Sequence, residues 1–239
     1  RSDRIVIGAE NSKAADQMKE VYKEQIQNGV PVLITDPQTA EMIKYASNAF
    51  LASKISFINE IAAICEHCGA DIALVAKGMG LDRRIGEQFL RPGPGFGGSC
   101  FPKDVKALSW IARQYGLRSV LLNSILEANT LQIKRMTEKI ENTAGEDLAG
   151  KTVTFLGLSF KPGTDDIRES PAVQIIKDIL EKKAIVKAYD PAAMERLKKE
   201  RPELDICYCG DISSACEGSD CIVLATEWEE FNGLDFDKL

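Results

Sequence analysis

The stretch Thr152–Tyr189, TVTFLGLSFKPGTDDIRESPAVQIIKDILEKKAIVKAY, decides the fold of the C-terminal part of the chain. It opens and closes with apolar, β-branched runs at 152–156 and 185–189, which predict two buried strands. Between them, Ser170 followed by Pro171 predicts the start of a helix. A strand, a helix and a second strand in this order form a parallel pair, so the stretch predicts an α/β sheet.

The same alternation continues beyond this stretch, whereas the residues before it are mostly helical. Short apolar runs at 206–208 and 221–225 predict two further strands. The polar segment 142–150 predicts a boundary between domains. We therefore predict three parts: a strand–helix–strand remnant of an N-terminal domain over residues 1–35, an all-helical central domain over 36–145 and an α/β domain over 146–239.

One predicted helix is unusually long. Residues 36–37, Asp-Pro, are typical of a helix start, and the pattern continues without a break until Gly69. Between residues 45 and 59 the only charged side chain is Lys54, so we expect most of the helix surface to be buried. A small domain rarely covers such a helix alone. We therefore predict a homodimer whose interface runs along this helix.

The segment Arg91–Asp104, RPGPGFGGSCFPKD, is the strongest indication of chemistry. Cys100 follows a run of glycine and proline and comes directly before a predicted helix at 102–115. Unpaired backbone N–H groups and the positive end of the helix dipole favour a thiolate at such a position. Asp104 lies about one turn further along. The residues alone leave open whether Cys100 is a nucleophile or a small apolar residue in a turn.

Two pairs of polar side chains are further candidates. Lys44 and Asn48 share a face of the long helix, where they could stabilise an oxyanion or a bound water. Lys161 and Arg168 follow the first strand of the α/β domain, where ligands of open sheets bind, and two cations there suit a diphosphate. Surface polarity explains either pair equally well. Asp190 occupies the place of the ribose-binding acid of NAD folds, but we interpret it as a helix N-cap.

Composition and charge argue against several classes of function. The formal net charge is −6 without a basic block, which argues against nucleic acid as a partner. No apolar run reaches transmembrane length and no signal-peptide pattern is visible, so we expect no membrane partner. The seven cysteines are odd in number and most lie in apolar helix or strand patterns, so we interpret them as reduced thiols of a cytoplasmic protein. Residues 65–68 have the Cys-x-x-Cys spacing, but no matching pair lies nearby and His67 is the only histidine, so we predict no metal site.

Three long segments carry a resemblance to a known family: residues 39–62, TAEMIKYASNAFLASKISFINEIA; residues 81–104, LDRRIGEQFLRPGPGFGGSCFPKD; and residues 157–172, GLSFKPGTDDIRESPA. They are similar to the UDP-glucose/GDP-mannose dehydrogenase family. The resemblance implies an N-terminal NAD-binding Rossmann domain, of which this chain holds only the last strand. It further implies a central helical dimerisation domain and a C-terminal Rossmann-like domain for the UDP-sugar, which stops before the family's final strand.

The resemblance also implies a reaction. Two NAD-dependent oxidations would convert the C6 alcohol of UDP-glucose to the acid, and Ser99 before Cys100 resembles the UDP-glucose and GDP-mannose branches. Cys100 would be the nucleophile and would carry a thiohemiacetal and then a thioester. Lys44 and Asn48 would steady the oxyanion and position water, and Asp104 would assist. The residues that would bind the sugar nucleotide are Phe89, Gly97, Phe101, Phe160, Lys161 and, in the neighbouring subunit's site, Arg84; Lys103 and Arg168 would lie near NAD.

The sequence leaves several alternatives open. Because the glycine-rich NAD loop is not in the sequence, we expect the chain alone to be inactive. It could be a dimeric sugar-nucleotide-binding module without activity, or part of a GDP-mannose or UDP-N-acetylhexosamine dehydrogenase. A cysteine hydrolase or a zinc protein ranks lower.

Overall fold

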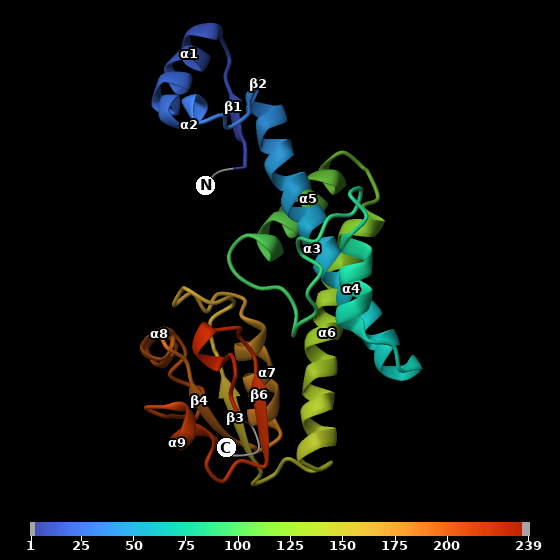
Figure 1. Cartoon of the computed structure of the whole chain (residues 1–239), viewed down its shortest axis with the longest axis vertical. Helices are drawn as coiled ribbons and strands as arrows, with labels where there is room; N and C mark the ends of the chain where they lie inside the picture. The colour runs from blue at the N-terminus through green and yellow to red at the C-terminus, as the bar shows by residue number, and fades with distance from the viewer. Residues whose placement is uncertain (1–2, 236–239) are drawn as a thin grey trace. The chain divides into compact units, whose positions relative to one another are not determined.

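The computed structural model describes residues 3–235 and divides them, between Phe50 and Leu51, into two compact units (Figure 1). In the first unit, two parallel strands are connected through two short helices and lead into a long helix. Its small core is formed by Ile5, Ile7 and Val30. The elements are β1 (Ile5–Gly8), α1 (Ser12–Val21), α2 (Lys23–Gln27), β2 (Val32–Thr35) and the beginning of α3 (Pro37–Cys68).

The predicted strands of this unit are confirmed, and the predicted helix between them is interrupted. Ile5 of β1 pairs with Val32 of β2 in parallel register. Asn11 caps α1 by accepting the N–H of Ala14 at 2.9 Å. Tyr22 then leaves the helical conformation, with φ −99° and ψ 18°, so the expected single helix becomes α1 and α2.

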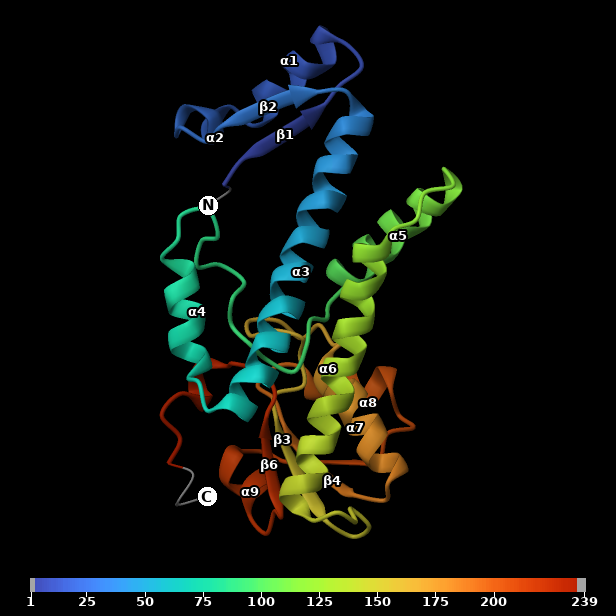
Figure 2. The same cartoon turned by 90° about the vertical axis from the view of Figure 1, so that its right-hand side faces the viewer.

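The second unit contains the remainder of α3, three further helices and the α/β domain (Figure 2). α3 begins and ends where the sequence predicts, and Phe101 opens the helix that follows the cysteine. The remaining elements are α4 (Ile72–Gly80), α5 (Phe101–Gln114), α6 (Val120–Ala144), β3 (Thr152–Leu156), α7 (Pro171–Glu181), β4 (Ile185–Tyr189), α8 (Met194–Glu200), β5 (Ile206–Tyr208), α9 (Ile212–Cys216), β6 (Cys221–Leu224) and the 3-10 helix η1 (Glu229–Phe231).

The predicted parallel sheet is confirmed. Among residues 3–235 it has four strands in the order β5-β4-β3-β6, and every pairing is parallel. Val153 and Phe155 of β3 face the main core with α6, α7 and α8, and both are fully buried. Leu156 faces the other side, where α9 and η1 cover the sheet. Helices on both faces explain why these strands are continuous apolar runs rather than alternating ones.

The sequence placed the start of α8 too early. α8 begins at Met194 rather than directly after Asp190, and a turn occupies residues 191–193. The carboxylate of Asp190 accepts the N–H groups of Ala192 and Ala193 at 2.8 and 2.7 Å, so it caps this turn. Across the described residues, no helix combines the length and apolar character needed to span a membrane.

Candidate functional site

Cys100 lies at the N-terminal end of α5. It is the residue immediately before Phe101, and Pro102 follows at the second helical position, where a missing N–H loses no helical hydrogen bond. The cysteine is exposed, and its sulfur lies 3.8 Å from the hydroxyl oxygen of Ser99. The carbonyl of Cys100 accepts the N–H of Asp104 at 2.8 Å. The thiol therefore sits at a helix start and within reach of solvent.

Asp104 and Lys103 form an ion pair in the first turn of α5. The Asp104 side chain is only 3% exposed, whereas that of Lys103 is 67% exposed. The Lys103 Nζ donates to Asp104 Oδ1 at 2.5 Å. Because a buried carboxylate needs such partners, Lys103 stabilises the charge of Asp104.

The glycines before Cys100 pack against the loop at 157–170. A Cβ added to Gly97 would lie 2.3 Å from the carbonyl oxygen of Glu169, and one added to Gly98 would lie 2.7 Å from the Phe160 ring. The N–H of Gly98 donates to the Arg168 carbonyl at 2.8 Å. Gly98 also has φ +79°, which side-chain-bearing residues rarely adopt. The contact therefore requires both glycines.

This contact brings a cation near Cys100. Arg168 donates from Nε and Nη2 to the two carboxylate oxygens of Asp166, at 2.9 and 2.7 Å. The pairing lowers the pKa of Asp166 to about 2 and raises the pKa of Arg168. The negative charge of the Cys100 thiolate contributes a smaller part of the rise in the Arg168 pKa, so the two groups lie within electrostatic range. The Arg168 side chain is more than half exposed and can meet an anionic ligand.

A cavity of about 370 Å³ opens beside this contact. Phe89 and Phe160 give it aromatic walls, and Arg91 and Lys161 bring two cations. The Lys161 Nζ lies 5.3 Å from the centre of the Phe160 ring. Arg91 pairs with Glu227, also in the wall, at 2.9 Å. A concave site with aromatic walls and two cations suits a ring system joined to an anionic group.

Phe89 is strained at this site. Its φ of +65° lies in the left-handed region, which is rare for a bulky residue and costs about 1–3 kcal/mol. Its ring contacts that of Phe101 edge-to-face, with centroids 6.0 Å apart. Phe101 makes a similar contact with Phe96 at 6.1 Å. Phe101 therefore fixes the aromatic ring that lines the cavity.

Three further predicted site residues belong to other segments of the chain. Lys44 and Asn48 are one turn apart on the part of α3 in the first unit, whereas Cys100 belongs to the second, and their grouping with Cys100 stays a prediction. Arg84 lies in the exposed loop after α4 and donates to Asp82 at 2.6 Å. This pairing raises the pKa of Arg84. Its place in a neighbouring subunit's site also stays a prediction.

Asp190 has a larger role than that of an N-cap. Its side chain is completely buried, and one oxygen caps the turn before α8. The other oxygen joins the loop after β3 to the loop after β6. Its donors are the N–H of Leu158 at 2.7 Å, the N–H and Oγ–H of Ser159 at 3.1 and 3.2 Å, and the indole N–H of Trp228 at 3.1 Å.

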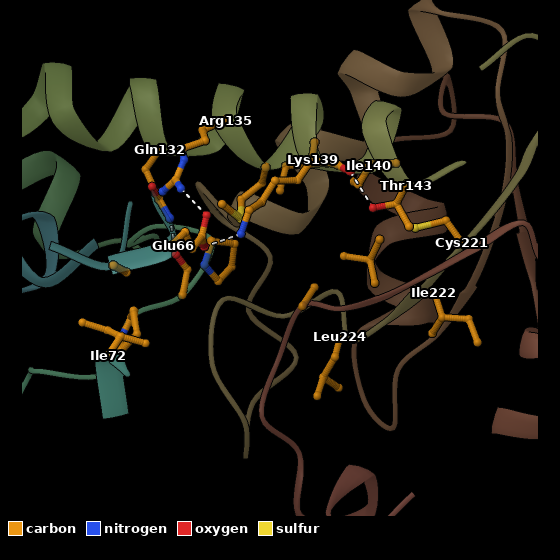
Figure 3. Close-up of a pocket in the computed structure, with 18 residues that line it drawn as sticks. Glu66, Ile72, Gln132, Arg135, Lys139, Ile140, Thr143, Cys221, Ile222 and Leu224 are labelled. Carbon is orange, nitrogen blue, oxygen red and sulfur yellow. Dashed lines mark hydrogen bonds and ion pairs between the residues drawn. The ribbon is translucent and has the colours of Figure 1, made fainter. Parts of the chain in front are cut away.

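Figure 3 shows a second cavity, whose volume is about 430 Å³. It shares the segment Pro92–Pro94 with the first cavity as a wall. In it, Glu66 of α3 pairs with Arg135 and Lys139 of α6. Burial opposes ionisation of Glu66, but these two cations outweigh it and the pKa of Glu66 is lowered. The wall of this cavity, like that of the first, therefore carries two cations and one carboxylate.

The cysteine pair at 65–68 does not resemble a metal site. Cys65 is buried, Cys68 is exposed, and the Nδ1 atom of His67 lies 2.8 Å from the Ala63 carbonyl. Within residues 3–235, no three side chains of histidine, cysteine, aspartate or glutamate come together as possible metal ligands.

Sequence reasoning missed the polar residues that hold the loop at 91–100, called here the cysteine loop because it leads to Cys100. On α6, Asn129 and Gln132 share one helix face with the buried Ile125 and with Met136. Amides on an otherwise apolar face indicate buried hydrogen bonds, so the signal was present in the sequence. It did not indicate which backbone groups they bind.

Two family models match the chain. Residues 38–131 match the central domain of the UDP-glucose/GDP-mannose dehydrogenase family, and residues 154–239 match its UDP binding domain. The chain belongs to the UDP-glucose/GDP-mannose dehydrogenase family. The match to the second model begins within β3, so the UDP binding domain of this family includes the loop that contacts Gly97 and Gly98.

Curated relatives from this family cover the whole chain. A UDP-glucose 6-dehydrogenase of Rickettsia bellii is 47% identical over 237 residues, which are 99% of this chain and 55% of the relative. One from Rhizobium meliloti is 46% identical and is likewise covered over 55% of its length. The chain thus spans about half the length of the curated relatives it matches.

Solved structures of family members share the fold. A UDP-glucose dehydrogenase from Pyrobaculum islandicum superposes with a TM-score of 0.92 at 38% identity, over 99% of this chain and 54% of that one. A UDP-D-ManNAc dehydrogenase from Pyrococcus horikoshii gives a TM-score of 0.81 at 26% identity, over 98% and 52%. The helical central region and the parallel sheet therefore have counterparts in sugar-nucleotide dehydrogenases.

Proposed function

We propose that this chain is the thiol- and nucleotide-binding part of an NAD-dependent dehydrogenase that oxidises the C6 alcohol of UDP-glucose to the acid of UDP-glucuronate. The observation that carries the proposal is the position of Cys100, exposed at the start of α5 and near Arg168. The names of the relatives and the match to a UDP binding domain support the substrate.

The cavity would receive the sugar nucleotide. Phe89 and Phe160 provide faces for a flat ring, and Lys161 together with Arg91 would neutralise the diphosphate. Gly97 allows the cysteine loop to approach the loop at 157–170. Phe101 would support Phe89, and Arg84 would reach into the site of a neighbouring subunit.

Lys103 and Arg168 fit an anionic cofactor by their charge and exposure. The turn after β3 lacks the glycine pattern that cradles a dinucleotide, so this turn does not provide the main NAD site. Bound NAD supplies the acceptor for both hydrides. The chain's own residues would hold the substrate, form the thioester and admit water.

In this mechanism, Cys100 acts after the alcohol has become an aldehyde. The thiolate forms a bond to C6 and the aldehyde oxygen takes up a proton, which gives a thiohemiacetal. Loss of a hydride from C6 and of that proton leaves a thioester, and water then adds to C6 and releases the thiolate and the acid. Lys44 and Asn48 would steady the oxyanion and position this water, and Asp104 would orient it. A nucleophilic thiolate requires a reducing environment, so we propose a cytoplasmic location.

The decisive test uses a protein that joins this chain to an NAD-binding domain. Cys100→Ser should abolish net formation of UDP-glucuronate. Cys68→Ser, which removes another exposed thiol, should leave turnover unchanged. Unchanged turnover in Cys100→Ser would refute the assignment. The chain alone should bind UDP-glucose without reducing NAD.

A second candidate function is a sugar-nucleotide-binding module without activity. It is favoured because all residues that line the 370 Å³ cavity belong to the second unit. Calorimetry with UDP-glucose, UDP, UDP-N-acetylmannosamine and GDP-mannose would compare the possible ligands. Absence of heat with UDP-glucose and UDP at millimolar ligand would contradict a UDP-binding role, and preferential binding of another nucleotide would reassign the substrate.

We also propose a homodimer along α3. Phe50, Phe57 and Ile64 are spaced seven residues apart on this helix, and each is at least half exposed in the single chain. Such an apolar stripe indicates a contact with another surface. Light scattering after size exclusion should show a dimer, and Phe57→Glu should shift it towards monomer, whereas the exposed Glu60→Gln should not. A monomeric wild-type chain would contradict this interface.

A further inference from the structure

Two buried amide side chains hold Gly93, in the loop at 91–100. Asn59 of α3 accepts the N–H of Gly93 at 2.8 Å, and Gln132 of α6 donates to the Gly93 carbonyl at 2.8 Å. Asn59 is 2% exposed and Gln132 is 9% exposed. The Asn59 Nδ2 atom is buried and has no hydrogen-bond partner among the described residues, which lowers stability. A leucine would avoid that loss, so the bond to Gly93 is what the asparagine adds here.

Asn129 holds Phe96 with both ends of one amide. Its Oδ1 accepts the N–H of Phe96 at 2.8 Å, and its Nδ2 donates to the Phe96 carbonyl at 3.0 Å. A neighbouring strand would make the same pair of bonds. A Cβ on Gly95 would lie 2.9 Å from the Asn129 Oδ1, so glycine at 95 allows this approach. The loop is irregular, yet both backbone polar groups of Phe96 are bonded.

The fixed Phe96 lies four residues before Cys100, and the residues between them have little freedom. Gly97 packs against the Glu169 carbonyl, and the N–H of Gly98 donates to the Arg168 carbonyl. Cys100 then leads directly into α5. Movement at Phe96 would therefore displace the sulfur from its exposed place at the start of α5.

We propose that Asn129 is a positioning residue for Cys100, and that it forms an amide clamp with Asn59 and Gln132. The clamp acts through the backbone of Gly93 and Phe96 and keeps the thiol where it is nucleophilic. Its importance for catalysis rests on the proposed function of Cys100. The reactivity of the thiol can be measured without substrate or cofactor.

The test replaces Asn129 in this chain and follows alkylation of Cys100 by iodoacetamide at neutral pH. Asn129→Leu removes both bonds. Asn129→Asp keeps an acceptor for the Phe96 N–H but sets a second acceptor against the Phe96 carbonyl. Mass spectrometry of the tryptic peptide that carries Cys100 gives the rate. We expect alkylation to be slower by about threefold in Asn129→Leu and slower also in Asn129→Asp, since the sulfur is no longer held in its exposed place at the helix start. Amide hydrogen exchange at Phe96 should become faster in both variants.

The matched control is Asn123→Leu on the same helix. Asn123 takes part in a hydrogen bond with Ser109 at 2.7 Å, outside the cysteine loop. The exposed thiols Cys68 and Cys207 are internal references in every variant. An unchanged or faster rate at Cys100 in Asn129→Leu would overturn the proposal, and so would equal slowing at the reference thiols or in Asn123→Leu. If the leucine variant does not fold, Asn129→Asp must still slow Cys100 selectively.

Nucleotide binding separates this inference from the proposed function. Residues 91–95 of the clamped loop line the nucleotide cavity, so Asn129→Leu should also weaken the binding of UDP. The two proposals are therefore separated by comparing UDP binding of the wild-type chain with the alkylation rates of Cys100. If the wild-type chain binds no UDP and Asn129→Leu still slows Cys100, the clamp stands and the substrate proposal falls. If UDP binds and Cys100 is unaffected, the clamp alone is wrong.

Discussion

Replacing Asp190 by asparagine would show how strongly the loop that carries Phe160 and Lys161 is held. The buried carboxylate accepts two N–H groups at Oδ1, and three N–H groups and one hydroxyl at Oδ2. Asparagine has the same shape, but one of its ends is an NH₂ group, which cannot accept. In either orientation of the asparagine side chain, the NH₂ group faces N–H or O–H donors, which are then left without an acceptor.

The loss in the free energy of unfolding can be estimated from the side-chain orientation that leaves fewer donors without an acceptor. With Nδ2 at the Oδ1 position, the N–H groups of Ala192 and Ala193 are left without an acceptor. Each hydrogen bond to a charged, buried partner contributes about 1.5 kcal/mol, so the two bonds together give a loss of about 3 kcal/mol in the free energy of unfolding. The opposite orientation leaves more donors unpaired and costs more.

Urea unfolding, followed by tryptophan fluorescence, measures this loss. Because the Trp228 indole donates to Asp190, its emission should also change in the folded variant. Asp211→Asn is the matched control, since Asp211 caps α9 by accepting the N–H of Ser214 at 2.8 Å and asparagine caps nearly as well. A loss in Asp190→Asn no larger than in Asp211→Asn would refute the reasoning. Weaker binding of UDP should accompany the loss because the loop moves.

Two further predictions concern the same region. Gly98→Ala and Gly163→Ala both place alanine at a positive φ, +79° and +76°, but of the two only Gly98 faces a neighbour, the Phe160 ring. Urea unfolding should therefore show that Gly98→Ala loses about 1–3 kcal/mol more of the free energy of unfolding than Gly163→Ala. Equal losses in the two variants would contradict the contact. The pKa of Asp166 lies at about 2, below its ordinary 3.8, because Arg168 donates to it, so the stability from this pair is complete above about pH 4 and is lost as the pH falls towards 2. Asp166→Asn should therefore lower the free energy of unfolding by about 1 kcal/mol at neutral pH, allowing for the exposure of Arg168. This difference from wild type should disappear near pH 2. A difference that stays constant as the pH falls would contradict the predicted pH dependence.

Most of the fold could be predicted because its signals are local. Unbroken apolar runs gave β3 and β4 within a residue, and helical periodicity with Asp-Pro and Gly at its ends gave α3. Boundaries were less certain where a tertiary contact competes with a local signal. The sequence predicted that α8 starts directly after Asp190. In the structure, Oδ2 of Asp190 accepts the N–H groups of Leu158 and Ser159, and the helix begins later, at Met194.

The features of the candidate site also divide into those that local sequence determines and those that depend on tertiary contacts. The sequence by itself placed Cys100 at a helix start and marked the loop at 157–170 as a ligand-binding turn, because composition and spacing over a few residues determine such features. Only the tertiary structure decided that Gly98 meets Phe160, that Asn129 binds Phe96 and that Asp190 joins two loops. Those partners are between 31 and 62 residues apart in the chain, and their hydrogen bonds and close contacts depend on packing that no local pattern records.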